Sequence, residues 1–153
     1  MLVRFTKNAP SAPADTLICE RADGTTARHD LPRQGILPHD AFHFVVETTL
    51  GWRDAFFGRV AAGATFHDLG VAPKKRTQLL QAAALVECLE ATQWGGAPDH
   101  AAFAKTLAAA CRRRRVPPPA TTAADLTRVR LALREFGAAW RPLNPGQSIE
   151  RNF

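Results

Sequence analysis

The sequence contains no tyrosine, one methionine and only three cysteines among its 153 residues. The missing tyrosine removes one class of acid/base side chain. Cys19, Cys88 and Cys111 lie far apart and none belongs to a C-x-x-C pair, which argues against a disulfide framework and a cysteine-based zinc site. We interpret them as small buried hydrophobic residues in a reducing cytoplasm. Cys111 directly precedes Arg112, a cation that could activate its thiol.

Several other signals are missing as well. No run approaches the roughly 18 apolar residues of a membrane-spanning helix. The stretch from Met1 to Lys7 has no apolar core and no cleavage site, so it does not resemble a secretory signal. No glycine-rich phosphate loop, nucleophile elbow or dinucleotide-binding fingerprint occurs. These absences predict a cytoplasmic protein without a membrane partner, and they leave no motif that names a reaction.

The composition is that of an ordinary globular domain, with 46% hydrophobic and 22% charged residues. A chain of this length suits one domain, and we take residues 1–153 as a single unit. Such a domain can bury about 70% of the surface that its unfolded chain exposes, so it needs neither disulfides nor a metal to fold.

The pattern of apolar residues predicts an α+β fold. Strands are expected over 2–7, 16–21 and 25–31, and Asp23-Gly24 forms the turn of an N-terminal hairpin unit, 1–31. A helical body, 38–140, follows, with 64–72 as a loop and five helices, at 38–50, 53–62, 73–94, 100–114 and 123–140. The alternating segment 147–153 predicts a C-terminal strand that pairs with the N-terminal strands in a small antiparallel sheet. Strands and helices are segregated along the chain, which disfavours a parallel α/β sheet.

The helix expected at 38–50 brings metal-competent side chains together. Four titratable residues share an arc of about 100° at the edge of its apolar face: His39, Asp40, His43 and Glu47. Imidazoles at i and i+4 can reach one cation, and a glutamate one turn further on can complete a three-ligand site. We therefore predict a zinc or other divalent transition-metal site made by His39, His43 and Glu47. Asp40 would act beside it, as an orienting or acid/base group.

Two interpretations of this helix stay open. Further metal ligands would have to come from other segments, and the candidates are His29, His67, Asp68 and His100. Zinc proteases carry H-E-x-x-H, but Asp40 stands at the glutamate position here, so we do not predict a protease. In the structural alternative, both histidines hydrogen-bond at a core margin and Asp40 interacts with the helix dipole.

The same segment carries a resemblance. Residues 37–47, with the sequence LPHDAFHFVVE, are followed by Gly51 and by FFGRVAAG at 56–63. This combination resembles a set of uncharacterised bacterial proteins, which begin with a similar hairpin and end near a Pro-Gly-containing strand. The likeness covers most of the chain but departs at Ala41, where leucine is expected. The resemblance implies an architecture and no established activity.

The positive charge lies almost entirely in the last third of the chain. Residues 1–100 contain 10 Lys+Arg and 11 Asp+Glu, a net charge of −1, whereas residues 101–153 contain 10 and 3, a net charge of +7. The arginines that could bind phosphates or acidic side chains are Arg112, Arg113, Arg114, Arg115, Arg130, Arg134 and Arg141. No known nucleic-acid-binding motif accompanies them. The alternative is that these arginines are solvated and cover the core with their aliphatic stems. A GC-rich genome also favours arginine without selection for any partner.

These observations support two hypotheses of different classes. The first is a small metal-binding protein centred on His39, His43 and Glu47, with a hydrolase-like enzyme as one form of it. The second is a non-enzymatic interaction module, in which the histidines are structural and residues 112–141 meet a nucleic acid or an acidic protein. The metal content of the purified protein separates the two hypotheses.

Overall fold

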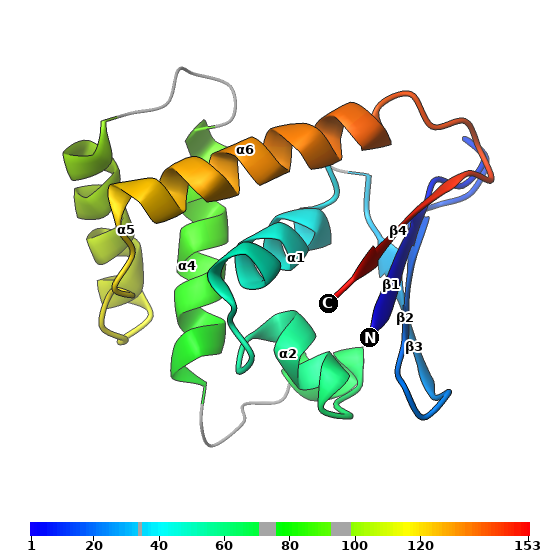
Figure 1. The fold of residues 1–153 in the computed structure, drawn as a ribbon, viewed down its shortest axis with the longest axis horizontal. Helices are drawn as coiled ribbons and strands as arrows, with labels where there is room; N and C mark the ends of the chain where they lie inside the picture. Colours follow the sequence, from blue (N-terminus) through cyan, green and yellow to red (C-terminus); the bar gives the residue numbers. More distant parts are fainter. Residues whose placement is uncertain (34, 71–75, 93–98) are drawn as a thin grey trace.

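A computed structural model describes residues 1–33, 35–70, 76–92 and 99–153. It confirms the α+β fold: a four-stranded antiparallel sheet lies on one side of the molecule and the helices lie on the other (Figure 1). Among the described residues, no helix is long and apolar enough to cross a membrane.

The sheet joins the two ends of the chain. Its strands are β1 (Leu2–Thr6), β2 (Asp15–Glu20), β3 (Thr26–Leu31) and β4 (Ser148–Asn152), in the order β3-β2-β1-β4. Alternate residues of β1 face the helices, so Val3 and Phe5 are fully buried. Phe5 pairs with Leu17 on one side and Ile149 on the other. The C-terminal strand therefore completes the sheet beside β1, as the sequence predicts.

The helices follow the sequence pattern with one addition. Their bounds are α1 His39–Leu50, α2 Phe56–Ala61, α3 Phe66–Gly70, α4 Thr77–Thr92, α5 His100–Arg113 and α6 Ala123–Trp140. The prediction of a loop over 64–72 is wrong for α3, whose start is stabilised because the Asp68 carboxylate accepts hydrogen bonds from the Thr65 backbone and hydroxyl. The predicted ends of α4, at 73–75 and 93–94, lie outside the described residues.

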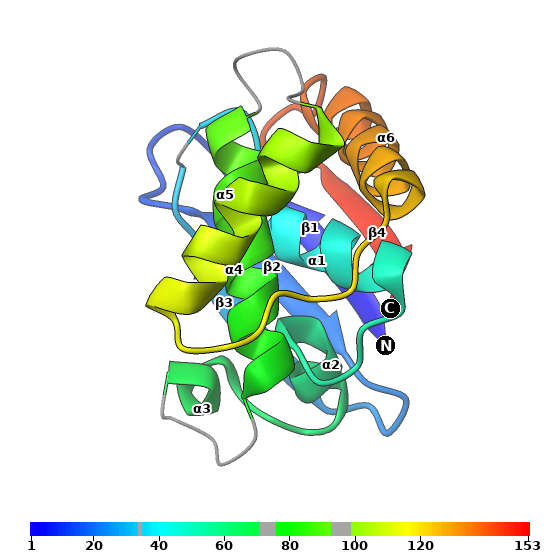
Figure 2. The ribbon, with the colours of Figure 1, turned by 90° about the vertical axis from the view of Figure 1, so that its left-hand side faces the viewer.

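Helix α1 occupies the centre of the molecule. It packs against α6, α4 and α2, and Phe44 meets the sheet at Phe5, with ring centroids 5.7 Å apart. Figure 2 shows α4 and α5 in front of α1 and the sheet, with α6 to one side. All eight residues from Asp40 to Glu47 are buried, so the helix has no solvent-facing stripe over this span. Polar residues here lie inside the molecule rather than at the margin of a core.

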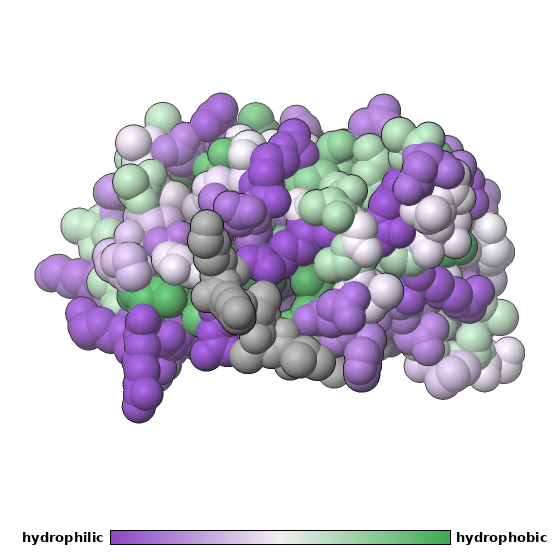
Figure 3. Space-filling view, turned by 90° about the horizontal axis from the view of Figure 1, so that it is seen from below, coloured by the Kyte–Doolittle hydropathy of each residue, from purple (hydrophilic) through white to green (hydrophobic). Residues whose placement is uncertain are grey.

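The surface seen from below is mixed. Hydrophilic residues cover most of this face, and hydrophobic residues form small separate groups among them (Figure 3). The coloured residues of this face therefore form no broad apolar surface of the kind that marks a permanent protein interface.

Candidate functional site

The structure places His39, Asp40, His43 and Glu47 beside two residues from distant segments. His29 Nε2 of β3 lies 3.9 Å from Asp40 Oδ2. His39 Nδ1 lies 2.9 Å from Glu90 Oε1 of α4, which is hydrogen-bonding distance. The imidazole rings of His39 and His43 lie edge to face with their centroids 5.1 Å apart. We call this group of six residues the histidine cluster: His29, His39, Asp40, His43, Glu47 and Glu90.

Glu47 joins the cluster to the start of α2. Its side chain is fully buried, and its Oε2 accepts hydrogen bonds from the backbone N–H groups of Phe57 (2.8 Å) and Gly58 (3.1 Å). These are first-turn amides that have no partner within their own helix. Gly58 permits the close packing, because a Cβ there would lie 2.1 Å from the carbonyl oxygen of Arg53. The Phe56-Phe57-Gly58 segment thus supplies two backbone donors to Glu47 and has a glycine where the Arg53 carbonyl leaves no room for a Cβ.

The second oxygen of Glu47 faces His43. Glu47 Oε1 and His43 Nδ1 are 3.6 Å apart, an ion-pair separation too long for a hydrogen bond, and neither buried atom has another hydrogen-bond partner. The His43 ring also lies against Phe56, with centroids 5.4 Å apart. The described residues give no hydrogen bond to Nε2 of either α1 histidine. Both imidazoles therefore direct Nδ1 at a carboxylate and keep Nε2 available.

Asp40 is a buried carboxyl among imidazoles. Burial raises its pKa above the ordinary value of 3.8, while His29, His43 and His39 oppose the rise. Desolvation prevails over this attraction, so the folded protein disfavours the ionised form of Asp40 unless a cation compensates it.

The cluster reaches solvent at two of its histidines. The side chains of His29 and His39 are 41% and 51% exposed, whereas that of His43 is 8% exposed. The His29 ring stacks on Phe66 of α3 at 4.8 Å between centroids. Helix α3, which the sequence did not predict, thus places the Phe66 ring against the histidine cluster.

The remaining candidate ligands, His67, Asp68 and His100, do not join the histidine cluster. Asp68 is engaged at Thr65, and no described contact joins His67 or His100 to the cluster. Across residues 1–33, 35–70, 76–92 and 99–153, no three His, Cys, Asp or Glu side chains form a group that could hold a metal ion as they stand. Metal binding would therefore need an exposed imidazole to rotate towards Asp40.

The cysteines lie apart from this chemistry. All three are free and buried. Burial raises the pKa of Cys19 to about 12 and also raises that of Cys111 above 9.0, so both thiols stay protonated at neutral pH. Arg114 is the cation that acts on Cys111, and its influence is smaller than that of burial. The idea that Arg112 activates this thiol finds no support.

Several of the predicted anion-binding arginines already have partners. Arg113 and Arg114 both pair with Glu87 of α4, at 2.5 and 2.6 Å. Arg130 lies over the ring of Phe103, 5.0 Å from its centroid, and so links α6 to α5. The exposed members of the predicted set are Arg112, Arg113, Arg115, Arg134 and Arg141. A nucleic-acid or acidic-protein partner at residues 112–141 stays a prediction.

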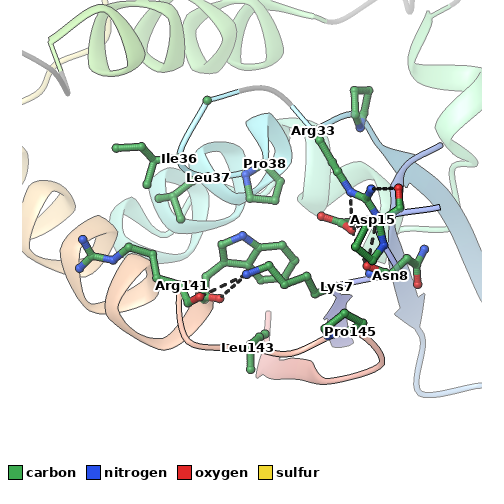
Figure 4. A pocket seen from close by; sticks show the side chains of 14 residues that line it. Lys7, Asn8, Asp15, Arg33, Ile36, Leu37, Pro38, Arg141, Leu143 and Pro145 are labelled. Atoms are coloured by element: carbon green, nitrogen blue, oxygen red, sulfur yellow. Dashed lines mark hydrogen bonds and ion pairs between the residues drawn. The ribbon is translucent and has the colours of Figure 1, made fainter. Parts of the chain in front are cut away.

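A second feature is a cavity of about 570 Å³ at the opposite end of β1 from the N-terminus. Figure 4 shows Lys7 extending across it towards the end of α6, with Ile36 and Pro38 on one side and Leu143 on the other. Its lining comprises Lys7, Asn8, Pro10, Asp15, Pro32, Arg33, Gly35, Ile36, Leu37, Pro38, Trp140, Arg141, Leu143 and Pro145. No local pattern in the sequence predicts this cavity, because its walls come from four stretches of the chain: 7–10, 15, 32–38 and 140–145.

No protein-family model matches the chain, and no curated protein or solved structure is similar enough to establish a relationship. The site must therefore be interpreted from its own geometry.

Proposed function

We propose that this protein binds a divalent transition metal, zinc being the best match, at the histidine cluster. The observation that carries the proposal is the orientation of the two α1 imidazoles. His39 faces Glu90 through Nδ1 and His43 faces Glu47 through Nδ1. Metal-ligating histidines characteristically turn their other ring nitrogen towards a carboxylate, which fixes the tautomer that leaves the ligating nitrogen unprotonated.

Asp40 is the third ligand in this proposal. It is adjacent to both α1 histidines, and its burial makes a compensating cation favourable. Two imidazoles and one carboxylate form a ligand set that suits zinc and leaves a coordination position open. His29, at 3.9 Å from Asp40, is placed to supply a fourth ligand after a small rotation. When bound, such an ion would supply Lewis acidity.

Glu47 has a different role from the one that the sequence suggests. One of its oxygens is engaged by two backbone amides, so we assign it to orienting His43 rather than to ligating the ion. A carboxylate beside Nδ1 favours the tautomer that carries its proton there, which frees Nε2 for a metal. A glutamine would reverse this preference, because its amide N–H would face Nδ1 and leave the proton on Nε2.

The experiment measures zinc in protein purified without a histidine tag, loaded with zinc and desalted, with Co²⁺ absorption as a second readout of coordination. We expect about one ion per chain in the wild type. Asp40→Asn, His39→Ala and Glu47→Gln should each lower the affinity by roughly 10- to 100-fold. His67→Ala and His100→Ala remove exposed imidazoles outside the cluster and should retain the metal. Substoichiometric zinc that is equal in all six proteins would refute the proposal.

A further inference from the structure

Two of the cations that line the cavity at the end of β1, Lys7 and Arg141, form no ion pair with a carboxylate of the described residues. Arg33 lines the cavity too, but it is 3.0 Å from Asp15 and donates to the carbonyl oxygens of Asn8 and Ala9. Among the described residues, Lys7 forms no ion pair. Its Nζ reaches only the carbonyl oxygens of Trp140 and Arg141, at 3.5 and 3.2 Å. An ammonium group has three donors, so Lys7 can still bind an anion.

Lys7 is held in place by its surroundings. Its backbone N–H donates to the carbonyl of Gln147, and its own carbonyl accepts from Gly146, so the residue continues the β1–β4 pairing. Its Nζ lies 5.6 Å from the centre of the Trp140 ring, and Trp140 itself is 4% exposed. In Figure 4 the Lys7 side chain extends across the cavity, whereas the Arg141 guanidinium points away. Lys7 is thus the one cationic group of the lining that is both unbalanced and directed across the cavity.

The rest of the lining is mainly apolar and stiff. Ile36 is one of the two large hydrophobic side chains that the described residues expose, at 42%. It faces a cavity that Leu143 and Trp140 also line. Four prolines contribute to the walls: Pro10, Pro32, Pro38 and Pro145. A volume of about 570 Å³ lies within the range of small-molecule sites, which are mostly apolar with a few placed polar groups.

We propose that this cavity binds a small organic carboxylate with an apolar body. The carboxylate pairs with Lys7, and the hydrocarbon or aromatic part packs against Trp140, Ile36 and Leu143. One negative charge is favoured over a polyphosphate, because Arg33 is already neutralised by Asp15 and the Arg141 guanidinium points away, which leaves Lys7 as the cation directed across the cavity. This site is separate from the histidine cluster, and its occupation requires no metal.

The test compares three eight-carbon probes by calorimetry at low ionic strength: octanoate, octan-1-ol and octylammonium. We expect octanoate to bind at least about tenfold more tightly than the neutral alcohol, and octylammonium to bind most weakly. Lys7→Met should reduce octanoate affinity about tenfold and leave octanol affinity unchanged, because it keeps the length of the side chain and removes its charge.

Two further substitutions separate binding from folding. Ile36→Asp places a charge in the cavity from an exposed position, so it should weaken octanoate and octanol alike without unfolding the protein. The controls are Lys105→Met and Leu131→Asp, which change an exposed lysine and the other exposed large hydrophobic residue outside the cavity. Both should bind octanoate like the wild type. Equal affinity for octanoate and octanol, or unchanged octanoate binding in Lys7→Met and Ile36→Asp, would overturn the proposal.

Discussion

Asp40 is the residue at which stability and the proposed function oppose each other. A buried carboxylate destabilises the folded state, because burial disfavours its charged form. The three neighbouring imidazoles oppose the rise in the pKa of Asp40, but burial has the larger effect. A bound cation would offset this penalty, which is the reason that the proposed function makes Asp40 a ligand.

We expect Asp40→Asn to stabilise the metal-free protein at neutral pH. The pKa of Asp40 is raised on folding, so its protonated form favours the folded state and its ionised form opposes it. The neutral asparagine avoids this opposition. The advantage of the variant should be absent below pH 3.8, grow as the pH rises towards the raised pKa, and be full above it. Urea unfolding at several pH values, with a chelator present, measures it.

The matched control is Asp68→Asn, whose carboxyl is exposed and whose pKa is lowered by its hydrogen bonds to Thr65. Here the sign is opposite, so this variant should lose stability above pH 4. If Asp40→Asn instead weakened the metal-free protein at pH 8, the carboxylate would be making a stabilising interaction, and its assignment as an uncompensated ligand would fail.

Much of the cluster lies beyond prediction from sequence for a definite reason. The i, i+4 spacing correctly places His39, His43 and Glu47 on neighbouring turns of one helix. Glu90 and the Phe57 amide are contributed by segments that only the tertiary fold brings close. Local periodicity carries no information on such contacts, so it places Glu47 beside the two histidines but does not reveal that one Glu47 oxygen accepts hydrogen bonds from two backbone amides at the start of α2.

At the scale of elements, the helix ends that carry capping residues are the best defined. Gly51 adopts φ of 68° after α1, as a C-terminal glycine should. Thr122 and Asp125 form a reciprocal capping box at the start of α6. What local patterns could not foresee is that residues 40–47 of α1 are buried on every side, because the helix packs against α2, α4 and α6 and meets the sheet at Phe5. The helical wheel of α1 therefore placed Asp40, His43 and Glu47 at the edge of an apolar face, whereas all three are buried in the structure.

Glu47 is the main polar link between α1 and α2, which yields a prediction at this scale. Glu47→Ala leaves the Phe57 and Gly58 amides unsatisfied in the core, so we expect it to lower the free energy of unfolding by about 3 kcal/mol or more. Glu47→Gln retains an oxygen for both amides and should cost about 1 kcal/mol or less. Chemical denaturation monitored by circular dichroism measures both values. Equal losses would show that the charge, rather than the capping oxygen, holds α2.

At the scale of the whole molecule, the fold depends on contacts between the ends of the chain. The central strand β1 pairs with β2 nearby in sequence and with β4 at the far end. Met1 and Phe153 exchange hydrogen bonds, through the Phe153 N–H at 2.9 Å and the Met1 amino group at 3.3 Å. The two ends of this chain are therefore adjacent, as Figures 1 and 2 both show.

This adjacency predicts that a circular permutant will fold. A short glycine-serine linker can join Phe153 to Met1, and new ends can open between Asp23 and Gly24, at the exposed tip of the β2–β3 hairpin. All four strands keep their partners, so the unfolding free energy should stay within about 2 kcal/mol of the parent value. A permutant opened between Phe57 and Gly58 breaks the buried α2 start and should be largely unfolded. Denaturant titrations measure the stability of both permutants. If the permutant opened at Phe57 folded and the one opened at Asp23 did not, the hairpin turn, rather than the α2 start that binds Glu47, would be the connection that the fold requires.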